Sequence, residues 1–205
     1  MTQRNADRLV WVDCEMTGLE LGRDALIEIA VIVTDSELVE LDEGIDVVIA
    51  PPAAALETMP EVVRTMHTES GLLDELAAGV DLATAQRLVL EYVRRHVPEP
   101  RKAPLAGSSV YVDRGFISRD LPEFDAHLHY RLVDVSSVKE LARRWYPKVF
   151  FASPKKTGNH RALADIQESI SELRFYRDTV FAASPGPDTD TARAAAARHA
   201  KGTSE

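Results

Sequence analysis

Residues 9–19 read LVWVDCEMTGL, and this stretch organises the rest of the chain. It has no polar residue before Asp13, which is typical of a short strand buried on both faces. Side chains alternate between the faces of a strand, so Asp13 and Glu15 point to the same side, about 7 Å apart at their Cα atoms. Two acids this close in an apolar strand are costly unless a positive charge lies between them. A divalent cation between the two carboxylates would meet that need. An equally good interpretation is that Asp13 and Glu15 merely end the strand at the protein surface.

The composition indicates an ordinary globular domain. The chain has 205 residues, 45% of them hydrophobic, which suits one domain with a sizeable core. We expect that domain over residues 8–181, between a flexible N-terminus at 1–7 and a disordered tail at 182–205. Cys14 is the one cysteine, so no disulfide can form within the chain. With no apolar run near the ~20 residues of a membrane span and no signal peptide, we expect a cytoplasmic protein without a membrane partner.

The charge is negative overall and unevenly distributed. The net charge of −9 argues against tight binding of long nucleic acid, because that affinity comes from many phosphate contacts. Residues 13–91 contain 18 acidic and 3 basic residues, a balance of −15, whereas residues 139–161 have a balance of +6. A solvated face is the simplest interpretation of the basic segment. The alternative is that it captures a small anionic substrate.

The hydrophobic pattern predicts an α/β domain with a mixed sheet flanked by helices. The first three strands follow one another closely, which favours an antiparallel meander. Two later strands are expected at 103–110 and 131–135. Helices are expected within 57–78, at 82–96, from Asp113 to 119 or 121, from a Ser136 or Ser137 cap to 145, and at 161–180, with a polar loop at 150–159.

Two further acids and a histidine, Asp113, Asp165 and His160, are candidate residues of a catalytic site. Asp113 follows the small-residue stretch 106–109, although a helix N-cap is its simpler role. Asp165 lies near the start of the last helix, where acids often serve the helix dipole. His160 precedes it on a loop, where a histidine is usually solvated. Together with the first two acids, they suit phosphodiester hydrolysis with two hard cations and a base whose pKa is near 7.

Three longer strings resemble a known family. VDCEMTGL at 12–19, HYRLVDVSSVKELARRWYP at 129–147 and NHRALADIQESISELRFYR at 159–177 are similar to oligoribonucleases, in the histidine-containing branch of the DEDD exonuclease superfamily. The resemblance covers about residues 8–181. It implies a ribonuclease H-like fold, two Mg²⁺ or Mn²⁺ ions, and a homodimer. It also implies 3′→5′ hydrolysis of very short RNA, especially dinucleotides, to nucleoside 5′-monophosphates.

The resemblance also implies roles for individual residues. The metal ligands would be Asp13, Glu15, Asp113 and Asp165, and His160 would be the general base. Leu19 would be a wedge between two bases. The groups around a 5′-phosphate would be His67, Ser109 and Ser136, and the groups at the dimer interface would be His129, Tyr130 and Arg131, of which the last two would reach the partner's site.

The chain departs from the family pattern at a few positions near the implied site. Val62 stands where the family often has a tryptophan, Ser108 replaces an asparagine, and Tyr111 and Val112 are bulky. Two alternatives of another class stay open. One is a DEDD exonuclease for longer substrates, which a compact chain without a broad basic face disfavours. The other is a non-catalytic nucleotide-binding module, which would ordinarily have lost one of the acids.

Overall fold

A five-stranded mixed sheet forms the centre of the computed structural model, which describes residues 7–155 and 161–200. The strand order is β3-β2-β1-β4-β5. The β1–β2 and β2–β3 pairs are antiparallel, while β1–β4 and β4–β5 are parallel, so the expected antiparallel start is confirmed. The strands are β1 (Leu9–Met16), β2 (Leu26–Thr34), β3 (Ile45–Val48), β4 (Pro104–Gly107) and β5 (His129–Asp134).

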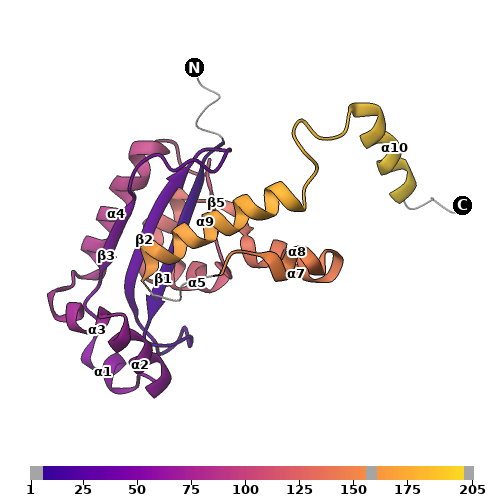
Figure 1. Cartoon of the computed structure of the whole chain (residues 1–205). Helices are drawn as coiled ribbons and strands as arrows, with labels where there is room; N and C mark the ends of the chain where they lie inside the picture. Colours follow the sequence, from indigo (N-terminus) through magenta and orange to yellow (C-terminus); the bar gives the residue numbers. More distant parts are fainter. Residues whose placement is uncertain (1–6, 156–160, 201–205) are drawn as a thin grey trace, which may run out of the picture.

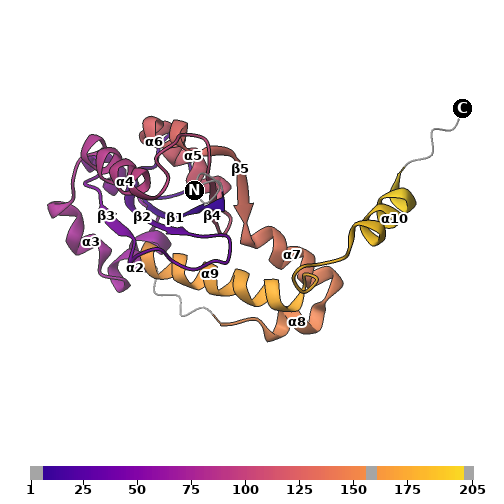
Figure 2. The same ribbon diagram turned by 90° about the horizontal axis from the view of Figure 1, so that it is seen from above.

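Helices cover both faces of this sheet (Figures 1 and 2). One face carries α4 (Leu82–His96), α5 (Tyr111–Asp120) and α6 (Pro122–His127), and the other carries α9 (Ala162–Thr179) beside α7 (Val135–Trp145) and α8 (Pro147–Ala152). Four short elements gather beside β3: α1 (Ala53–Glu57), α2 (Glu61–Glu69), α3 (Leu72–Glu75) and the 3₁₀ helix η2 (Leu76–Ala78). The sheet is therefore a layer between helices, as the sequence predicts.

Strand β1 is buried on both faces, as its apolar sequence predicts. Val10, Val12 and Cys14 belong to the core beneath α4, α5 and α6, whereas Trp11 belongs to the core beneath α9. Full burial of each such side chain contributes about 1.5–3 kcal/mol. The alternation leaves Asp13 and Glu15 on the α9 side of the sheet.

The segment between β4 and α5 differs from its prediction. The strand expected to reach residue 110 ends at Gly107, and α5 begins at Tyr111. A Cβ atom on Gly107 would lie 2.7 Å from the carbonyl oxygen of Val12, so a glycine allows the two backbones to approach. Ser109 then turns the chain with a φ of 55°. Asp113 is consequently in the first turn of α5, and its predicted N-cap role is wrong.

Several helix boundaries also need correction. Asp134, not Ser136 or Ser137, caps α7, because its carboxylate accepts a hydrogen bond from the Ser136 amide at 2.9 Å. The short helices α1, α6 and α8 were not predicted, and α8 occupies the start of the segment expected to be a loop. Proline occupies the first turn of α6 and α8, a position where it favours a helix start.

The C-terminal segment contains a helix that projects from the rest of the molecule (Figure 2). This helix, α10 (Thr189–His199), is capped by Asp188 and has no buried residue. The division of the chain into a domain with two tails stays a prediction. Within the described ranges, no helix is both long and apolar enough to cross a membrane.

Candidate active site

Three acidic side chains from two elements meet on the face of the sheet that α9 covers. Asp13 and Glu15 come from β1, and Asp165 comes from the first turn of α9. One ligand oxygen from each lies within 4.8 Å of the others, close enough for one ion to contact all three. We call these residues the acid cluster. The prediction that the two β1 acids share a side is confirmed, and the fold brings Asp165 to them.

Asp113 lies beside the acid cluster rather than within that group. Its Oδ1 accepts a hydrogen bond at 2.9 Å from the backbone amide of Cys14, the residue between the two acids of β1. The side chain is buried, and burial raises its pKa to about 6. The fold therefore joins Asp113 to the strand of Asp13, as expected. Its role as a fourth metal ligand stays a prediction.

The electrostatics of the acid cluster favour a cation. Burial, together with the negative charges of Glu28, Asp165 and Asp113, raises the pKa of Glu15 to about 8. The register of the β1–β2 ladder also shifts directly after Glu15, as β-bulges near active sites often do. Carboxylate oxygens are the ligands that hard divalent cations prefer. The cluster thus fits a divalent metal ion on its own chemistry.

His67 packs against the end of β1 next to the acid cluster. Its Nε2 lies 2.9 Å from the carbonyl oxygen of Met16, and its Nδ1 lies 4.0 Å from Oε2 of Glu15. Because a carbonyl oxygen can only accept, Nε2 is the protonated nitrogen in this contact. The histidine is fully buried, so α2 is anchored beside the acids. His160, the expected base, lies outside the described residues.

Two serines expected near a 5′-phosphate are linked by Asp134, which sequence reasoning missed. Oδ1 of Asp134 accepts from the Ser109 amide at 2.9 Å, the Ser136 amide at 2.9 Å and the Ser136 hydroxyl at 2.6 Å. One carboxylate therefore holds together the β4–α5 turn and the start of α7. An acid directly before Val135-Ser136-Ser137 at a strand-to-helix boundary is an N-cap signature that could have identified it.

Leu19 lies in a tightly braced loop that connects β1 to β2. The Thr17 amide donates to the Ala25 carbonyl, and the Ala25 amide donates to the Thr17 hydroxyl, both at 2.9 Å. Asp24 is buried and accepts from the Glu20 amide at 2.8 Å. Within this fixed frame Leu19 is 74% exposed. An apolar side chain held in water by a rigid loop is suited to contact a substrate.

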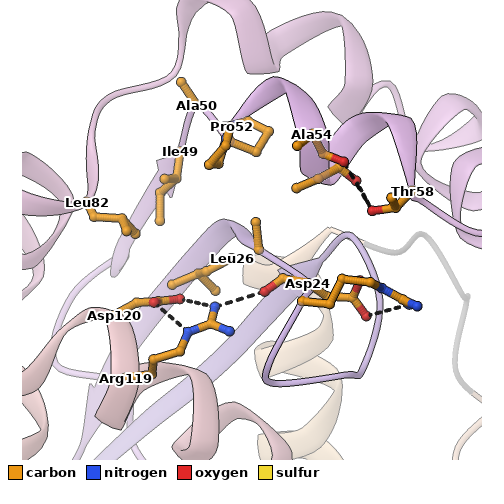
Figure 3. A pocket seen from close by; sticks show the side chains of 14 residues that line it. Asp24, Leu26, Ile49, Ala50, Pro52, Ala54, Thr58, Leu82, Arg119 and Asp120 are labelled. Carbon is orange, nitrogen blue, oxygen red and sulfur yellow. Dashed lines mark hydrogen bonds and ion pairs between the residues drawn. The ribbon is translucent and has the colours of Figure 1, made fainter.

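Arg119 at the end of α5 braces the same loop from outside. Its guanidinium donates to the carbonyl oxygen of Asp24 at 2.9 Å, while Asp120 accepts from its Nε at 2.7 Å (Figure 3). The guanidinium also donates to the carbonyl oxygen of Leu21. These side chains border a mostly apolar pocket of about 360 Å³, whose opposite wall includes Ile49 and Pro52 (Figure 3). The acid cluster does not line this pocket, so the pocket is not part of the candidate site.

Strand β5 forms one edge of the sheet and presents aromatic and basic side chains. Tyr130 is 75% exposed, and its ring centroid lies 4.4 Å from that of His129. The guanidinium of Arg131 lies 5.6 Å from the centroid of the Tyr130 ring. Tyr130 and Arg131 are thus exposed on an edge strand, beside the half-buried His129. Their predicted place at a dimer interface stays a prediction.

Four basic side chains of the segment 139–161, among its described residues, form ion pairs within the molecule. Lys139 pairs with Glu172 at 3.0 Å, and Arg161 pairs with Glu28 at 2.9 Å. Two arginines of α7 pair with Glu140 of the same helix. The alternative that this segment captures a small anionic substrate stays a prediction.

Comparisons with known proteins agree with the geometry. Residues 10–173 match the family RNase_T, described as Exonuclease. An oligoribonuclease of Streptomyces avermitilis is 69% identical over 193 residues, which cover 94% of this chain and 96% of that protein. An oligoribonuclease of Mycobacterium bovis is 57% identical over 197 residues, 96% and 92% of the two chains.

Solved structures of exonuclease I share the fold. A zinc-bound complex of the Escherichia coli enzyme with single-stranded DNA matches 85% of this chain at a TM-score of 0.63 and 16% identity, and an enzyme from Methylocaldum szegediense matches 84% at 0.59 and 20%. Both matches span 41% of the other chain. The sheet is thus of the ribonuclease H-like exonuclease type. The chain belongs to the oligoribonuclease family, within the exonucleases of the DEDD superfamily, and is a nuclease that hydrolyses its substrate.

Proposed function

We propose that the chain is a 3′→5′ exoribonuclease that converts very short RNA, from dinucleotides to about pentanucleotides, into nucleoside 5′-monophosphates. The observation that carries this proposal is the acid cluster of Asp13, Glu15 and Asp165, whose oxygens lie within 4.8 Å of one another. The names of the curated relatives support the same reaction. A cytoplasmic location stays a prediction.

The preference for short substrates follows from what surrounds the cluster. Leu19 stands exposed on its braced loop, where it can separate two bases by apolar contact. The Ser109 hydroxyl would donate a hydrogen bond to a terminal phosphate, and Ser136, whose amide and hydroxyl donate to Asp134 in the free protein, would exchange that acceptor for the phosphate. A site closed at one end by phosphate contacts accommodates few nucleotides. The net charge of −9 disfavours the binding of a long strand, because that affinity comes from many phosphate contacts.

The acids and the histidine divide the catalytic work. Asp13, Glu15, Asp165 and Asp113 would hold two divalent cations, Mg²⁺ or Mn²⁺. When bound, such ions neutralise charge on the phosphate oxygens and lower the pKa of the attacking water. His160 would accept the proton of that water, because an imidazole titrates near neutral pH. Leu19 and the two serines would hold the scissile phosphate in line for attack.

A homodimer would complete the substrate site. Tyr130 and Arg131 lie exposed on the edge strand β5, so neither contributes to the core of its own subunit. In a dimer they would reach the partner's site, where the ring stacks on a base and the guanidinium contacts a phosphate. In this arrangement only the assembled homodimer would be active.

The test is hydrolysis of a 5′-phosphorylated RNA series of two, five and twenty nucleotides, with Mg²⁺ and with EDTA. We expect kcat/KM to be highest for the dinucleotide, to fall with length, and to vanish with EDTA. Asp13→Asn should fold normally and lose hydrolysis, since the amide preserves shape and removes a charged ligand. Equal kcat/KM at all lengths would contradict the substrate assignment, and activity in EDTA would contradict the metal requirement.

A nuclease for longer strands is the second candidate, and the same series separates the two. The fold neighbours include exonuclease I in complex with a dA16 oligonucleotide. This chain matches only 41% of that neighbour's length, and the shared part gives the fold alone. Faster hydrolysis of the twenty-nucleotide RNA would favour this second function.

A further inference from the structure

Four charged side chains from four elements meet at the start of α9. The guanidinium of Arg161 contacts Glu28 of β2 at 2.9 Å, Glu75 of α3 at 2.8 and 3.0 Å, and Asp46 of β3 at 3.7 Å. We call these four residues the Arg161 cluster. Its contacts with Glu75 use two nitrogens and two oxygens, the bidentate geometry in which arginine pairs most specifically.

Glu28 also closes the N-terminus of α9. The side chain is fully buried, and its Oε2 accepts a hydrogen bond at 3.1 Å from the backbone amide of Ala162, the first residue of the helix. Arg161 occupies the cap position but its own side chain makes no cap bond. A carboxylate from β2 therefore satisfies an amide that the helix leaves open. Both oxygens of Glu28 thus fix the start of α9.

The Arg161 cluster is directly connected to the acid cluster. The carbonyl oxygen of Arg161 accepts the amide hydrogen of Asp165 at 3.1 Å, so the two residues bound the same helical turn. Glu28 is the cross-strand partner of Glu15 in the β1–β2 ladder. A displacement of the first turn of α9 would therefore move Asp165 relative to the two acids of β1.

We propose that Arg161 is a positioning residue whose pairing with Glu28 and Glu75 fixes the first turn of α9, so that Asp165 stays within shared-ligand distance of Asp13 and Glu15. The inference rests on the proposed function, because it assumes that these acids bind a divalent cation. It assigns a specific task to Arg161, which would touch neither metal nor RNA. The consequence is a metal affinity that depends on an ion pair outside the ligand set.

The test requires variants that release the first turn of α9 without changing the net charge of the protein. Arg161→Met combined with Glu28→Gln removes one positive and one negative charge, and the glutamine oxygen can still accept from the Ala162 amide. A second variant, Arg161→Lys, keeps the charge but cannot reproduce the bidentate contact. It also leaves Glu28 with a cationic neighbour, so it protects folding.

A matched control lies further along the same helix. Lys139 of α7 pairs with the buried Glu172 of α9 at 3.0 Å, away from the acid cluster. Lys139→Met combined with Glu172→Gln therefore removes a comparable buried pair on α9 without touching its first turn. The midpoint of thermal unfolding, measured without metal, would show whether the two double variants are similarly destabilised.

Metal-free protein is titrated with Mn²⁺ alone, and the electron paramagnetic resonance signal of the free ion is measured at each step to give the Kd. We expect the Kd of the Arg161→Met/Glu28→Gln protein to rise about tenfold, the lower range for residues that orient metal ligands. The control pair should keep the wild-type Kd. A rise of at least threefold over the control supports the proposal, and a smaller one overturns it. If the double variant does not fold, Arg161→Lys decides by the same threshold.

The readout separates this inference from the proposed function. Wild-type protein that binds Mn²⁺ but hydrolyses no RNA would refute the function and leave the positioning role supported or overturned by the Kd values. Wild-type protein that does not bind Mn²⁺ would overturn both.

Discussion

Glu15 and Glu28 face each other across the β1–β2 ladder, yet their carboxylates have opposite surroundings. Glu28 accepts hydrogen bonds from Arg161 and from the Ala162 amide, so the chain itself supplies its positive partners. Glu15 shares its space with Asp13 and with Asp165, and its pKa rises to about 8. The difference teaches that the fold satisfies one glutamate internally and arranges the other for a cation from outside.

Asp24 extends the comparison to an acid remote from α9. Burial by itself would raise its pKa, but hydrogen bonds from the Arg23 side chain and the Glu20 amide lower it below the usual value. Hydrogen bonds thus more than offset burial at Asp24, whereas at Glu15 burial, the largest cause of the raised pKa, adds to the negative charges of neighbouring acids.

The largest expected effect separates the two glutamates by activity. Glu15→Gln should lower kcat/KM on a dinucleotide by about 10³-fold, the scale of losing one preorganised charge at a reacting centre. Glu28→Gln should lower the free energy of unfolding by about 1 kcal/mol, because the glutamine oxygen can accept from the Ala162 amide but its nitrogen cannot accept from Arg161. Its kcat/KM should fall by less than about tenfold. Steady-state kinetics and urea unfolding of both variants test this, and a reversed order of effects would refute the assigned roles.

A second expected effect is a dependence of stability on pH in the metal-free protein. The pKa values of Glu15 and Glu28, raised to about 8 and about 7, exceed the usual 4.5, so the folded state binds more protons than the unfolded state between pH 4.5 and 8. Stability should therefore fall as pH rises through this window. Mg²⁺ should raise the Tm more at pH 8 than at pH 6, since it competes with protons. Calorimetry of wild type and Glu15→Gln checks this, and the variant should show a smaller decline.

The smallest expected effect concerns Arg119, which braces the loop beside the satisfied acid Asp24. Arg119→Met should raise KM for a dinucleotide about fivefold, as loss of about 1 kcal/mol of hydrogen bonding would do. The reason is that the loop no longer holds Leu19 in place. A p-nitrophenyl ester of a single nucleotide has no second base for Leu19 to contact, so its KM should not change. The control is Arg87→Met, which removes the exposed ion pair of Arg87 with Glu91 on α4. Equal effects on both substrates would rule out a role in base contact.

The parts of the site that follow from local sequence rules could be predicted. The alternation of side chains in β1 places Asp13 and Glu15 on one side, and helical periodicity places Asp165 at the start of α9. These rules depend on neighbouring residues only, so they need no knowledge of the tertiary structure.

The contacts between distant segments could not be predicted in this way. Arg161 contributes to a count of positive charge in the sequence, but its partner Glu28 is 133 positions away. Asp134 binds the Ser109 amide 25 positions away, and a strand pattern gives no signal for such a bond. The end of β4 also could not be predicted, because the approach of Gly107 to Val12 and the turn at Ser109 depend on how β4 packs beside β1.

The double burial of β1 has a consequence for amide hydrogen exchange. The strand pairs with β2 along its length and with β4 at Val10 and Trp11, and apolar side chains cover both of its faces. Such a strand opens only when the whole domain unfolds, so its amides are expected to exchange most slowly. The acids of β1 therefore stand on the most durable part of the molecule. Motions that admit substrate and release product therefore have to arise outside this strand.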